Sequence, residues 1–257
     1  MKYIFFDIDG TLVSHVGVSH IPDETRKAVT LLREAGHIPA IATGRGAFLA
    51  HQTALEFGID SLVCSGGAQV ISHGQEIFTA WFPDDELDAF REVAAEFPDR
   101  TAAIDDRYLY AGQAFGAFYD YFNGQAGYNC IRPLNAMKRA IICYVMIPPR
   151  LLTHEHGLFF SPPDGVRLEL MRDFTEARCA GTSKWKGIER LIEHERANID
   201  DVIVFGDGPN DAEMIGRANI GVAVGKSSDE AKKAADYVCD DIDDGGILKA
   251  CKHLGLI

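Results

Sequence analysis

Short apolar runs that end abruptly at polar residues are the feature that most restricts the fold of this chain. Three such runs occupy residues 2–6, 38–42 and 61–64. Residues 23–35 have apolar side chains at helical spacing, and a second helix is predicted to end near residue 57. The runs do not alternate between apolar and polar residues, which indicates strands buried on both faces. The order strand, helix, strand therefore predicts a parallel sheet with right-handed crossovers.

The same order returns near the C-terminus. Helices and strands are predicted there in alternation, at residues 183–196 (helix), 202–205 (strand), 210–218 (helix), 220–224 (strand) and 229–235 (helix). We therefore predict that both ends of the chain form one doubly wound α/β unit.

The middle of the chain follows another pattern. An amphipathic helix is predicted at residues 84–97. Strands in neighbouring pairs and one more helix follow it, at residues 101–105 (strand), 108–111 (strand), 115–122 (helix), 140–147 (strand) and 166–171 (strand). Paired strands indicate an antiparallel sheet with helices on one face. We interpret residues 83–182 as a second domain inserted into a first domain made of residues 1–82 and 183–257.

Composition excludes several classes of protein. Of the 257 residues, 47% are hydrophobic and 25% are charged, which supports a sizeable core and excludes a disordered chain or a disulfide-rich miniprotein. The net charge is −13, from 38 acidic and 25 basic residues. Because such a chain repels polyphosphate backbones, no nucleic-acid partner is expected. An anionic substrate would need a metal cation or a buried lysine nearby.

Cysteine spacing and hydropathy bear on the location of the protein. The six cysteines include no C-x-x-C pair, which argues against a zinc finger or a dithiol redox motif. The longest apolar run, residues 140–149, is far shorter than the roughly 18 residues of a membrane-spanning helix. Acidic residues at positions 7 and 9 come too early for a signal peptide. We expect a cytoplasmic protein with no membrane partner, and no feature predicts an oligomeric state.

Residues 7–11 read Asp-Ile-Asp-Gly-Thr and follow the first predicted strand directly. Asp7 and Asp9 leave the strand end on the same side, at the edge where open parallel sheets bind ligands. Paired carboxylates there suit Mg²⁺ binding, attack on phosphorus, or general acid and base catalysis. Gly10 permits close approach of the backbone to an anion. The alternative is a polar turn, which a D-x-D pattern alone fits equally well.

Three further groups are candidates for the same site. Asp207, in the sequence Gly-Asp-Gly-Pro-Asn-Asp of residues 206–211, follows a buried strand and needs a cationic partner there. Thr43 follows another strand, and its hydroxyl and the backbone amides around it suit phosphate oxygens. Lys184 begins a helix, an unfavourable end for a cation unless an anion binds nearby. The alternatives are helix capping at residues 210–211 and a solvated surface lysine at 184.

Taken in order, these motifs resemble those of the haloacid dehalogenase superfamily, in particular its Cof-type branch of small-molecule phosphatases with a class IIB cap. The resemblance covers the whole chain, with a long insertion between the second and third motifs. It implies a Rossmann-like doubly wound core with an inserted α/β cap that selects the substrate, Mg²⁺ as cofactor, and hydrolysis of small phosphomonoesters.

The resemblance also implies roles for single residues. Asp7 would be the nucleophile and Asp9 the general acid and base. Asp7, the backbone carbonyl of Asp9, and Asp207 would hold Mg²⁺. The remaining positions carried over are phosphate-binding Ile8, Gly10, Thr43, Gly44, Lys184 and Asn210, and supporting Arg45 and Asp211.

Two positions depart from the family pattern or leave it ambiguous. The family often has Asn-Gly-Ala after the third strand, whereas this chain has Gly66-Gly67-Ala68. The phosphate-binding lysine could be Lys184 or Lys186, and the alignment of the following helix favours Lys184.

Two other functions fit the same residues. A phosphomutase would return the phosphoryl group to a second hydroxyl of a phosphosugar. A non-catalytic phospho-acceptor, like a signalling receiver domain, also places an Asp, a Thr and a Lys around Mg²⁺. The inserted region and Asp9 argue against the receiver, which needs neither a lid nor an acid for a leaving group. Phosphosugars are the leading expectation for the substrate, followed by phosphorylated cofactors such as pyridoxal phosphate or flavin mononucleotide.

Overall fold

The computed structural model describes residues 1–14, 16, 19–112, 131–146, 164–170 and 174–257. Contacts divide the chain into two compact units. Unit 1 comprises Met1–Arg45, Ala50–Ile77 and Ser183–Ile257, and unit 2 comprises Gly46–Leu49 and Phe78–Thr182. The helix predicted at residues 115–122 lies outside the described residues. No helix among the described residues is long and apolar enough to cross a membrane.

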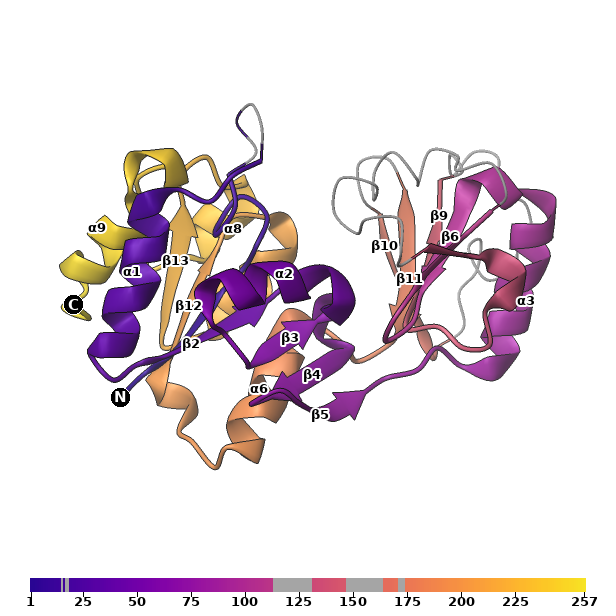
Figure 1. The fold of residues 1–257 in the computed structure, drawn as a ribbon, viewed down its shortest axis with the longest axis horizontal. Helices are drawn as coiled ribbons and strands as arrows, with labels where there is room; N and C mark the ends of the chain where they lie inside the picture. The colour runs from indigo at the N-terminus through magenta and orange to yellow at the C-terminus, as the bar shows by residue number, and fades with distance from the viewer. Residues whose placement is uncertain (15, 17–18, 113–130, 147–163, 171–173) are drawn as a thin grey trace. The chain divides into compact units, whose positions relative to one another are not determined.

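Unit 1 is built on an eight-stranded sheet with the order β14-β13-β12-β1-β2-β3-β4-β5 (Figure 1). Its strands are β1 (Tyr3–Phe6), β2 (Ile38–Ala42), β3 (Leu62–Cys64), β4 (Gln69–Ser72), β5 (Gln75–Thr79), β12 (Val202–Gly206), β13 (Ile220–Val224) and β14 (Tyr237–Cys239). The six strands from β14 to β3 pair in parallel, whereas β4 runs antiparallel to β3. The predicted parallel sheet is therefore confirmed.

The chain winds away from β1 in both directions, which makes the unit doubly wound. From β1 it passes to β2 and β3 on one side, and from β12 it passes to β13 and β14 on the other. Its helices are α1 (Asp23–Glu34), most of α2 (Ala47–Phe57), α6 (Lys184–His194), α7 (Ala212–Arg217), α8 (Asp229–Ala234) and α9 (Gly246–His253). Because crossovers are right-handed, opposite directions of winding place helices on opposite faces of the sheet. In Figure 1, α1 accordingly lies in front of the sheet and α8 behind it.

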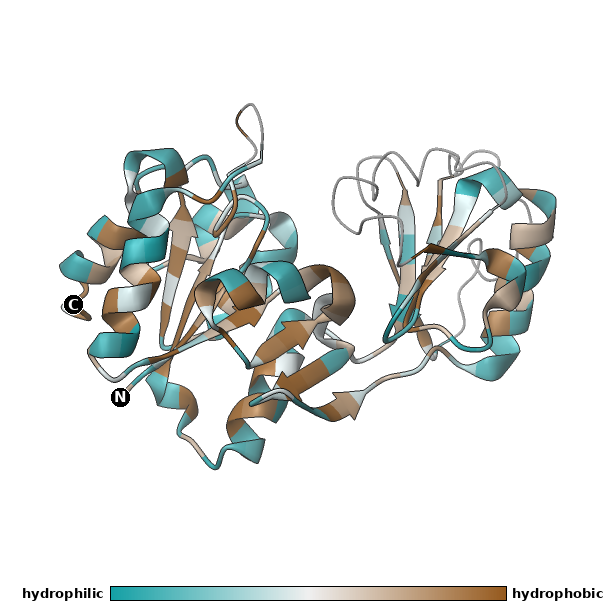
Figure 2. Cartoon of the chain, viewed as in Figure 1, coloured by the Kyte–Doolittle hydropathy of each residue, from teal (hydrophilic) through white to brown (hydrophobic). Residues whose placement is uncertain are grey.

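Burial explains why the strand sequences do not alternate. Every residue of β1 and β12 is buried, so both faces of these strands need apolar side chains. Figure 2 shows β12 as mainly hydrophobic, and α1 as striped with polar residues. The buried positions of α1 include Ala28, Val29 and Leu32, spaced to lie on one face of the helix.

Unit 2 contains a six-stranded sheet with the order β10-β11-β9-β6-β7-β8. Its elements are α3 (Asp84–Glu96), β6 (Thr101–Ile104), β7 (Leu109–Ala111), β8 (Ile131–Pro133), β9 (Ile142–Val145), β10 (Val166–Leu170) and β11 (Thr175–Cys179). The neighbouring pairs are antiparallel apart from β7 and β8, which are parallel. Leu87 and Phe90 of α3 belong to one apolar core with Ala103, Cys143 and Ala177 of the sheet. An antiparallel sheet with helices on one face was the prediction, and the parallel β7–β8 pair is the departure from it.

Short turns of 3-10 helix complete the described chain. They are η1 (Ser65–Gly67), η2 (Pro98–Arg100), η4 (Leu134–Ala136), η7 (Ile199–Asp201), η8 (Pro209–Asp211) and η9 (Ile242–Asp244). Two of them lie at carboxyl ends of strands, where ligands of doubly wound sheets bind: η1 directly follows β3, and η8 begins three residues after the end of β12.

Candidate active site

Two neighbouring strands of unit 1, β1 and β12, place two aspartates side by side. β1 and β12 are parallel neighbours in register, with Phe6 opposite Phe205. The next residue after Phe6 is Asp7, whose backbone N–H donates to the carbonyl of Phe205 at 2.9 Å. Asp207 follows β12 at the same edge. Asp7 and Asp207 therefore lie at the same edge of the sheet, as predicted.

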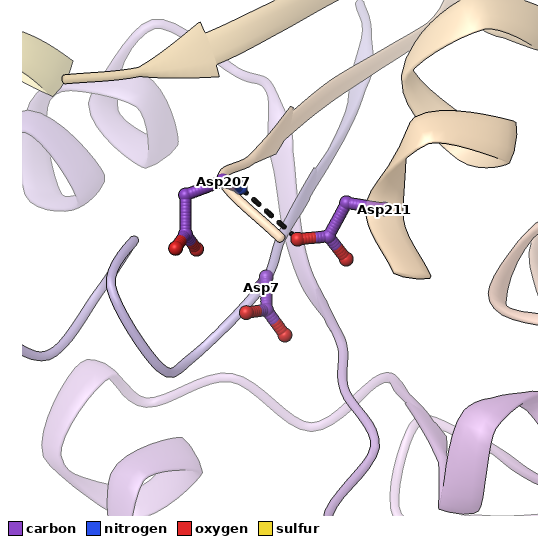
Figure 3. Close-up of side chains that lie close together, drawn as sticks. All are labelled: Asp7, Asp207 and Asp211. Atoms are coloured by element: carbon purple, nitrogen blue, oxygen red, sulfur yellow. Dashed lines mark hydrogen bonds between the residues drawn. The ribbon is translucent and has the colours of Figure 1, made fainter. Parts of the chain in front are cut away.

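Asp211 joins these two residues to form a group of three carboxylates. Each of Asp7, Asp207 and Asp211 offers an oxygen within 4.8 Å of the others (Figure 3). Asp211 is fully buried, and its Oδ2 accepts from the backbone N–H groups of Asp207 at 3.0 Å and Gly208 at 2.9 Å. Asp211 therefore fixes the turn that presents Asp207.

Lys184 brings a positive charge to this group. Its Nζ donates to Asp7 Oδ1 at 2.7 Å and to Asp211 Oδ1 at 2.5 Å, and the residue is only 4% exposed. Ser183 caps α6, because its hydroxyl accepts from the N–H of Lys186 at 3.2 Å. The ammonium of Lys186 is exposed and pairs with Glu189. Of the two candidate lysines, Lys184 is the one at the acidic group.

The charges in this group do not balance. Burial raises the pKa of Asp7 well above its usual value, despite the lowering effect of Lys184. Burial, with the repulsion of Asp211, raises the pKa of Asp207 to about 6. Burial alone would lower the pKa of Lys184, but Asp211 and Asp7 together raise it, so the lysine stays protonated. Three carboxylates around one ammonium leave an excess of negative charge that a divalent cation would neutralise.

The donor set suits a hard cation such as Mg²⁺, because every side-chain ligand that it offers is a carboxylate oxygen. Asp211 already uses one oxygen on Lys184 and the other on two backbone N–H groups. Asp7 and Asp207 are therefore the side chains best placed to coordinate the ion.

Asp9 is held by an arginine rather than by the acidic group. Arg45 Nε donates to Asp9 Oδ2 at 2.8 Å, and Arg45 Nη2 donates to Asp9 Oδ1. The Arg45 side chain is 13% exposed and that of Asp9 is 37% exposed. The backbone N–H of Arg45 donates to the hydroxyl of Thr43 at 3.1 Å, which connects this pair to the tip of β2.

Gly10 and Thr11 shape the space around Asp207. Gly10 has φ +85°, and a Cβ there would lie 2.3 Å from Asp207 Oδ2, so only glycine fits. The hydroxyl of Thr11 donates to Asp207 Oδ1 at 3.1 Å. Thr11 was not predicted to be a site residue. The only signal in the sequence was its place directly after Asp-Ile-Asp-Gly.

The remaining predicted positions lie around the same strand ends. Ile8 is buried, and its carbonyl accepts from the N–H groups of Leu12 and Val13. Thr43 is buried at the tip of β2. The next residue, Gly44, has open space beside it, because a Cβ built there would meet nothing within 4 Å. Asn210 is half-buried in η8.

Gly66, the position that departs from the family pattern, has φ 59° and ψ 31°. Asparagine and glycine both adopt this left-handed region. Glycine in place of the family's asparagine therefore removes a side chain but allows the same backbone conformation.

Comparisons with known proteins agree with this geometry. The model of the family described as haloacid dehalogenase-like hydrolase matches residues 4–136 and 172–251. The chain is 30% identical to the Bacillus subtilis (strain 168) protein named "Putative phosphatase YkrA", over all of this chain and 98% of that protein.

Two solved structures share the whole fold. A hypothetical protein from Geobacillus kaustophilus HTA426 superposes with a TM-score of 0.86 and 29% identity, covering all of this chain and 99% of the other. The HAD subclass IIB sugar phosphatase BT4131 superposes with a TM-score of 0.83 and 28% identity, covering all of both chains. Together, the motifs, the fold and these relatives show that the chain belongs to the haloacid dehalogenase-like hydrolases and is a phosphatase of that superfamily.

Proposed function

We propose that this phosphatase hydrolyses small phosphomonoesters with the help of Mg²⁺, through a phosphoryl group held covalently on Asp7. The observation that carries the proposal is the position of Lys184. Its buried ammonium bonds Asp7 and Asp211 in a group that also contains Asp207. A phosphate ester carries spread negative charge, so a site that positions it and neutralises that charge provides most of the catalysis.

Asp7 is the proposed nucleophile. Its carboxylate oxygen attacks phosphorus, the bond from phosphorus to the ester oxygen breaks, and the phosphoryl group is transferred to Asp7. Lys184 fixes the direction of the Asp7 carboxylate through its 2.7 Å hydrogen bond. It also lessens the repulsion between that carboxylate and the incoming phosphate.

Asp7, Asp207 and the backbone carbonyl of Asp9 are the proposed ligands of Mg²⁺. The bound ion would neutralise phosphate oxygens and act as a template for the ester. Thr11 and Gly10 keep Asp207 in place for this role, the first by its hydrogen bond and the second by leaving room for the carboxylate.

Asp9 is the proposed general acid and base. It would protonate the leaving alkoxide, and the resulting carboxylate would then take a proton from the water that attacks the aspartyl phosphate. Arg45 is the proposed positioning residue, because a guanidinium that contacts both oxygens fixes a carboxylate plane in one orientation.

The phosphate subsite is proposed to consist of the Thr43 hydroxyl, the Lys184 ammonium and polar groups of the surrounding turns. Ile8, Gly10, Gly44 and Asn210 are carried over from the family pattern as further phosphate-binding positions. The N–H of Gly10 donates to the carbonyl of Val13 at 2.9 Å, so Gly10 would serve by permitting close approach of the backbone to the anion.

Unit 2 is proposed to serve as the cap that selects the leaving group. A cap excludes water and completes the pocket around the substrate. We propose a phosphosugar as substrate, and the support is the likeness to BT4131, which is described as a sugar phosphatase.

The test is hydrolysis of p-nitrophenyl phosphate and of a panel of sugar phosphates, with and without Mg²⁺. The wild-type protein should be active only with the divalent ion. Asp7→Asn should lower kcat by about 10³-fold or more, because the nucleophile is lost. Full activity of Asp7→Asn, or full activity of the wild type in excess EDTA, would contradict the proposal.

A further inference from the structure

The turn directly after β3 has an unusual backbone. Ser65, Gly66 and Gly67 form η1, all three are buried, and their φ angles are 53°, 59° and 89°. Positive φ at three successive positions, one of them a serine, is uncommon and persists only where the surrounding structure requires it. The contacts of the turn show what that surrounding structure is.

One side of the turn supports the loop after β2. The N–H of Ser65 donates to the carbonyl of Arg45 at 2.8 Å, and the N–H of Gly66 donates to the carbonyl of Thr43 at 3.0 Å. These two bonds fix the backbone of the residue proposed to bind phosphate and of the residue that holds Asp9.

The other side of the turn lies against the start of α6. A Cβ at Gly67 would be 1.8 Å from the carbonyl oxygen of Ser183 and 3.2 Å from the backbone nitrogen of Lys184. A Cβ at Gly187, one turn into α6, would be 2.3 Å from Val63 Cγ1 and 3.1 Å from Gly67 Cα. No side chain fits between the turn and the helix that carries Lys184.

We propose that η1 is a rigid spacer that sets the separation between Thr43 and Lys184, and that Gly67 is a positioning residue for phosphate binding. The inference rests on the proposed function, in which these two residues bind phosphate. The proposed metal ligands Asp7 and Asp207 follow β1 and β12, which pair with each other. The N–H groups of Ser65 and Gly66 in η1 donate to Arg45 and Thr43, so η1 reaches Asp7 through the hydrogen bond from Lys184 and does not itself hold either metal ligand. Changes at the spacer should therefore weaken the binding of phosphate more than the binding of Mg²⁺.

The first experiment compares Gly67→Ala with Gly74→Ala. Both glycines have positive φ, 89° and 75°, but a Cβ at Gly74 would meet nothing within 4 Å. Calorimetry would measure the dissociation constants of Mg²⁺ and, at saturating Mg²⁺, of inorganic phosphate. Gly67→Ala should weaken phosphate binding about 10-fold or more while Mg²⁺ binding changes less than about 3-fold, and Gly74→Ala should change neither.

The second experiment displaces the spacer from the helix side, which keeps the test decisive if Gly67→Ala fails to fold. Gly187→Ala places a favourable helix residue in α6 but drives it against Val63. It should weaken phosphate binding several-fold, and the double variant Gly187→Ala/Val63→Ala should recover most of the loss, because the contact at 2.3 Å is removed.

Folded Gly187→Ala with the phosphate affinity of the wild type would overturn the inference. An equal loss of phosphate affinity and Mg²⁺ affinity in Gly67→Ala and Gly187→Ala would overturn it as well. Failure of the proposed function has a different signature, because it appears in the wild type as an absence of Mg²⁺-dependent hydrolysis.

Discussion

Arg45 donates hydrogen bonds to both carboxylate oxygens of Asp9, across 36 residues of sequence. A lysine at this position would supply one point charge in place of a planar pair of donors. Replacing Arg45 by lysine therefore keeps the positive charge beside Asp9 but removes the two-point contact that orients its carboxylate.

Arg45→Lys should lower kcat for an alkyl phosphate about 10-fold, and Arg45→Ala about 10²-fold, because a misdirected acid protonates the leaving oxygen poorly. KM should change little in both variants. Arg26→Lys is the matched control, since Arg26 also pairs with a carboxylate, Glu56, but at an exposed position. A change in KM alone would show that Arg45 binds substrate and does not position Asp9.

The two lysines at the start of α6 should respond very differently to the same change. Lys184→Met leaves Asp7 and Asp211 without their cation, and breaking a buried pair costs about 3–5 kcal/mol. The thermal midpoint should fall and phosphatase activity should be lost. Lys186 forms only an exposed pair with Glu189, so Lys186→Met should change the free energy of unfolding by no more than about 0.5 kcal/mol and should keep its activity. Equal effects of the two variants in thermal denaturation would contradict the assignment.

Asp207→Asn should make the metal-free protein more stable and the enzyme less active. The carboxyl of Asp207 is buried among like charges, so its ionised form is unfavourable in the folded state. The amide removes that cost but is a weaker ligand for Mg²⁺. We expect a higher thermal midpoint at pH 7.5 without metal and a much higher Mg²⁺ requirement in the activity assay. Asp200→Asn, on η7, is the control for loss of an acidic charge. An unchanged Mg²⁺ requirement would remove Asp207 from the metal site.

The stabilisation given by Mg²⁺ should grow as the pH rises. The pKa of Asp207 is about 6 in the folded protein against an ordinary value of 3.8, so between these values the folded state binds more protons than the unfolded state. Stability without metal therefore falls as the pH rises through this range, and Asp7 acts in the same direction. A bound cation offsets the cost. The rise in thermal midpoint on adding Mg²⁺ should be larger at pH 7.5 than at pH 5, and the opposite order would contradict this account.

The sequence predicted the elements whose signals are local. The apolar runs that become β1 and β12 end at Asp7 and Asp207, and a buried strand followed by an acidic residue is visible without tertiary information. The parallel sheet followed from the same runs. The choice of Lys184 over Lys186 came from aligning the following helix with the family pattern, and the structure places Lys184 at the acidic group.

Other features carried no local signal. β14 has three residues, one of them the exposed Val238, so neither length nor alternation marks it as a strand. The β4–β5 pair was not predicted, because both strands mix polar and apolar residues, and β5 is exposed or partly exposed along its whole length. Two contacts are tertiary and join distant segments: the hydrogen bonds between Arg45 and Asp9, and the packing of the start of α6 against Gly67. Their residues look ordinary until the fold brings them together.

The most direct test of the account is the time course of Asp9→Asn with p-nitrophenyl phosphate. Nitrophenolate leaves with little help from an acid, but water attacking the aspartyl phosphate still needs a base. Rapid mixing should show a burst of about one nitrophenolate per active site and then a slow steady state, and intact-mass analysis should show one added phosphoryl group that is absent from Asp7→Asn. With an alkyl phosphate, no phosphoenzyme should accumulate. No burst together with near wild-type turnover of the alkyl ester would contradict the assignment of Asp9 and the two-step account built on it.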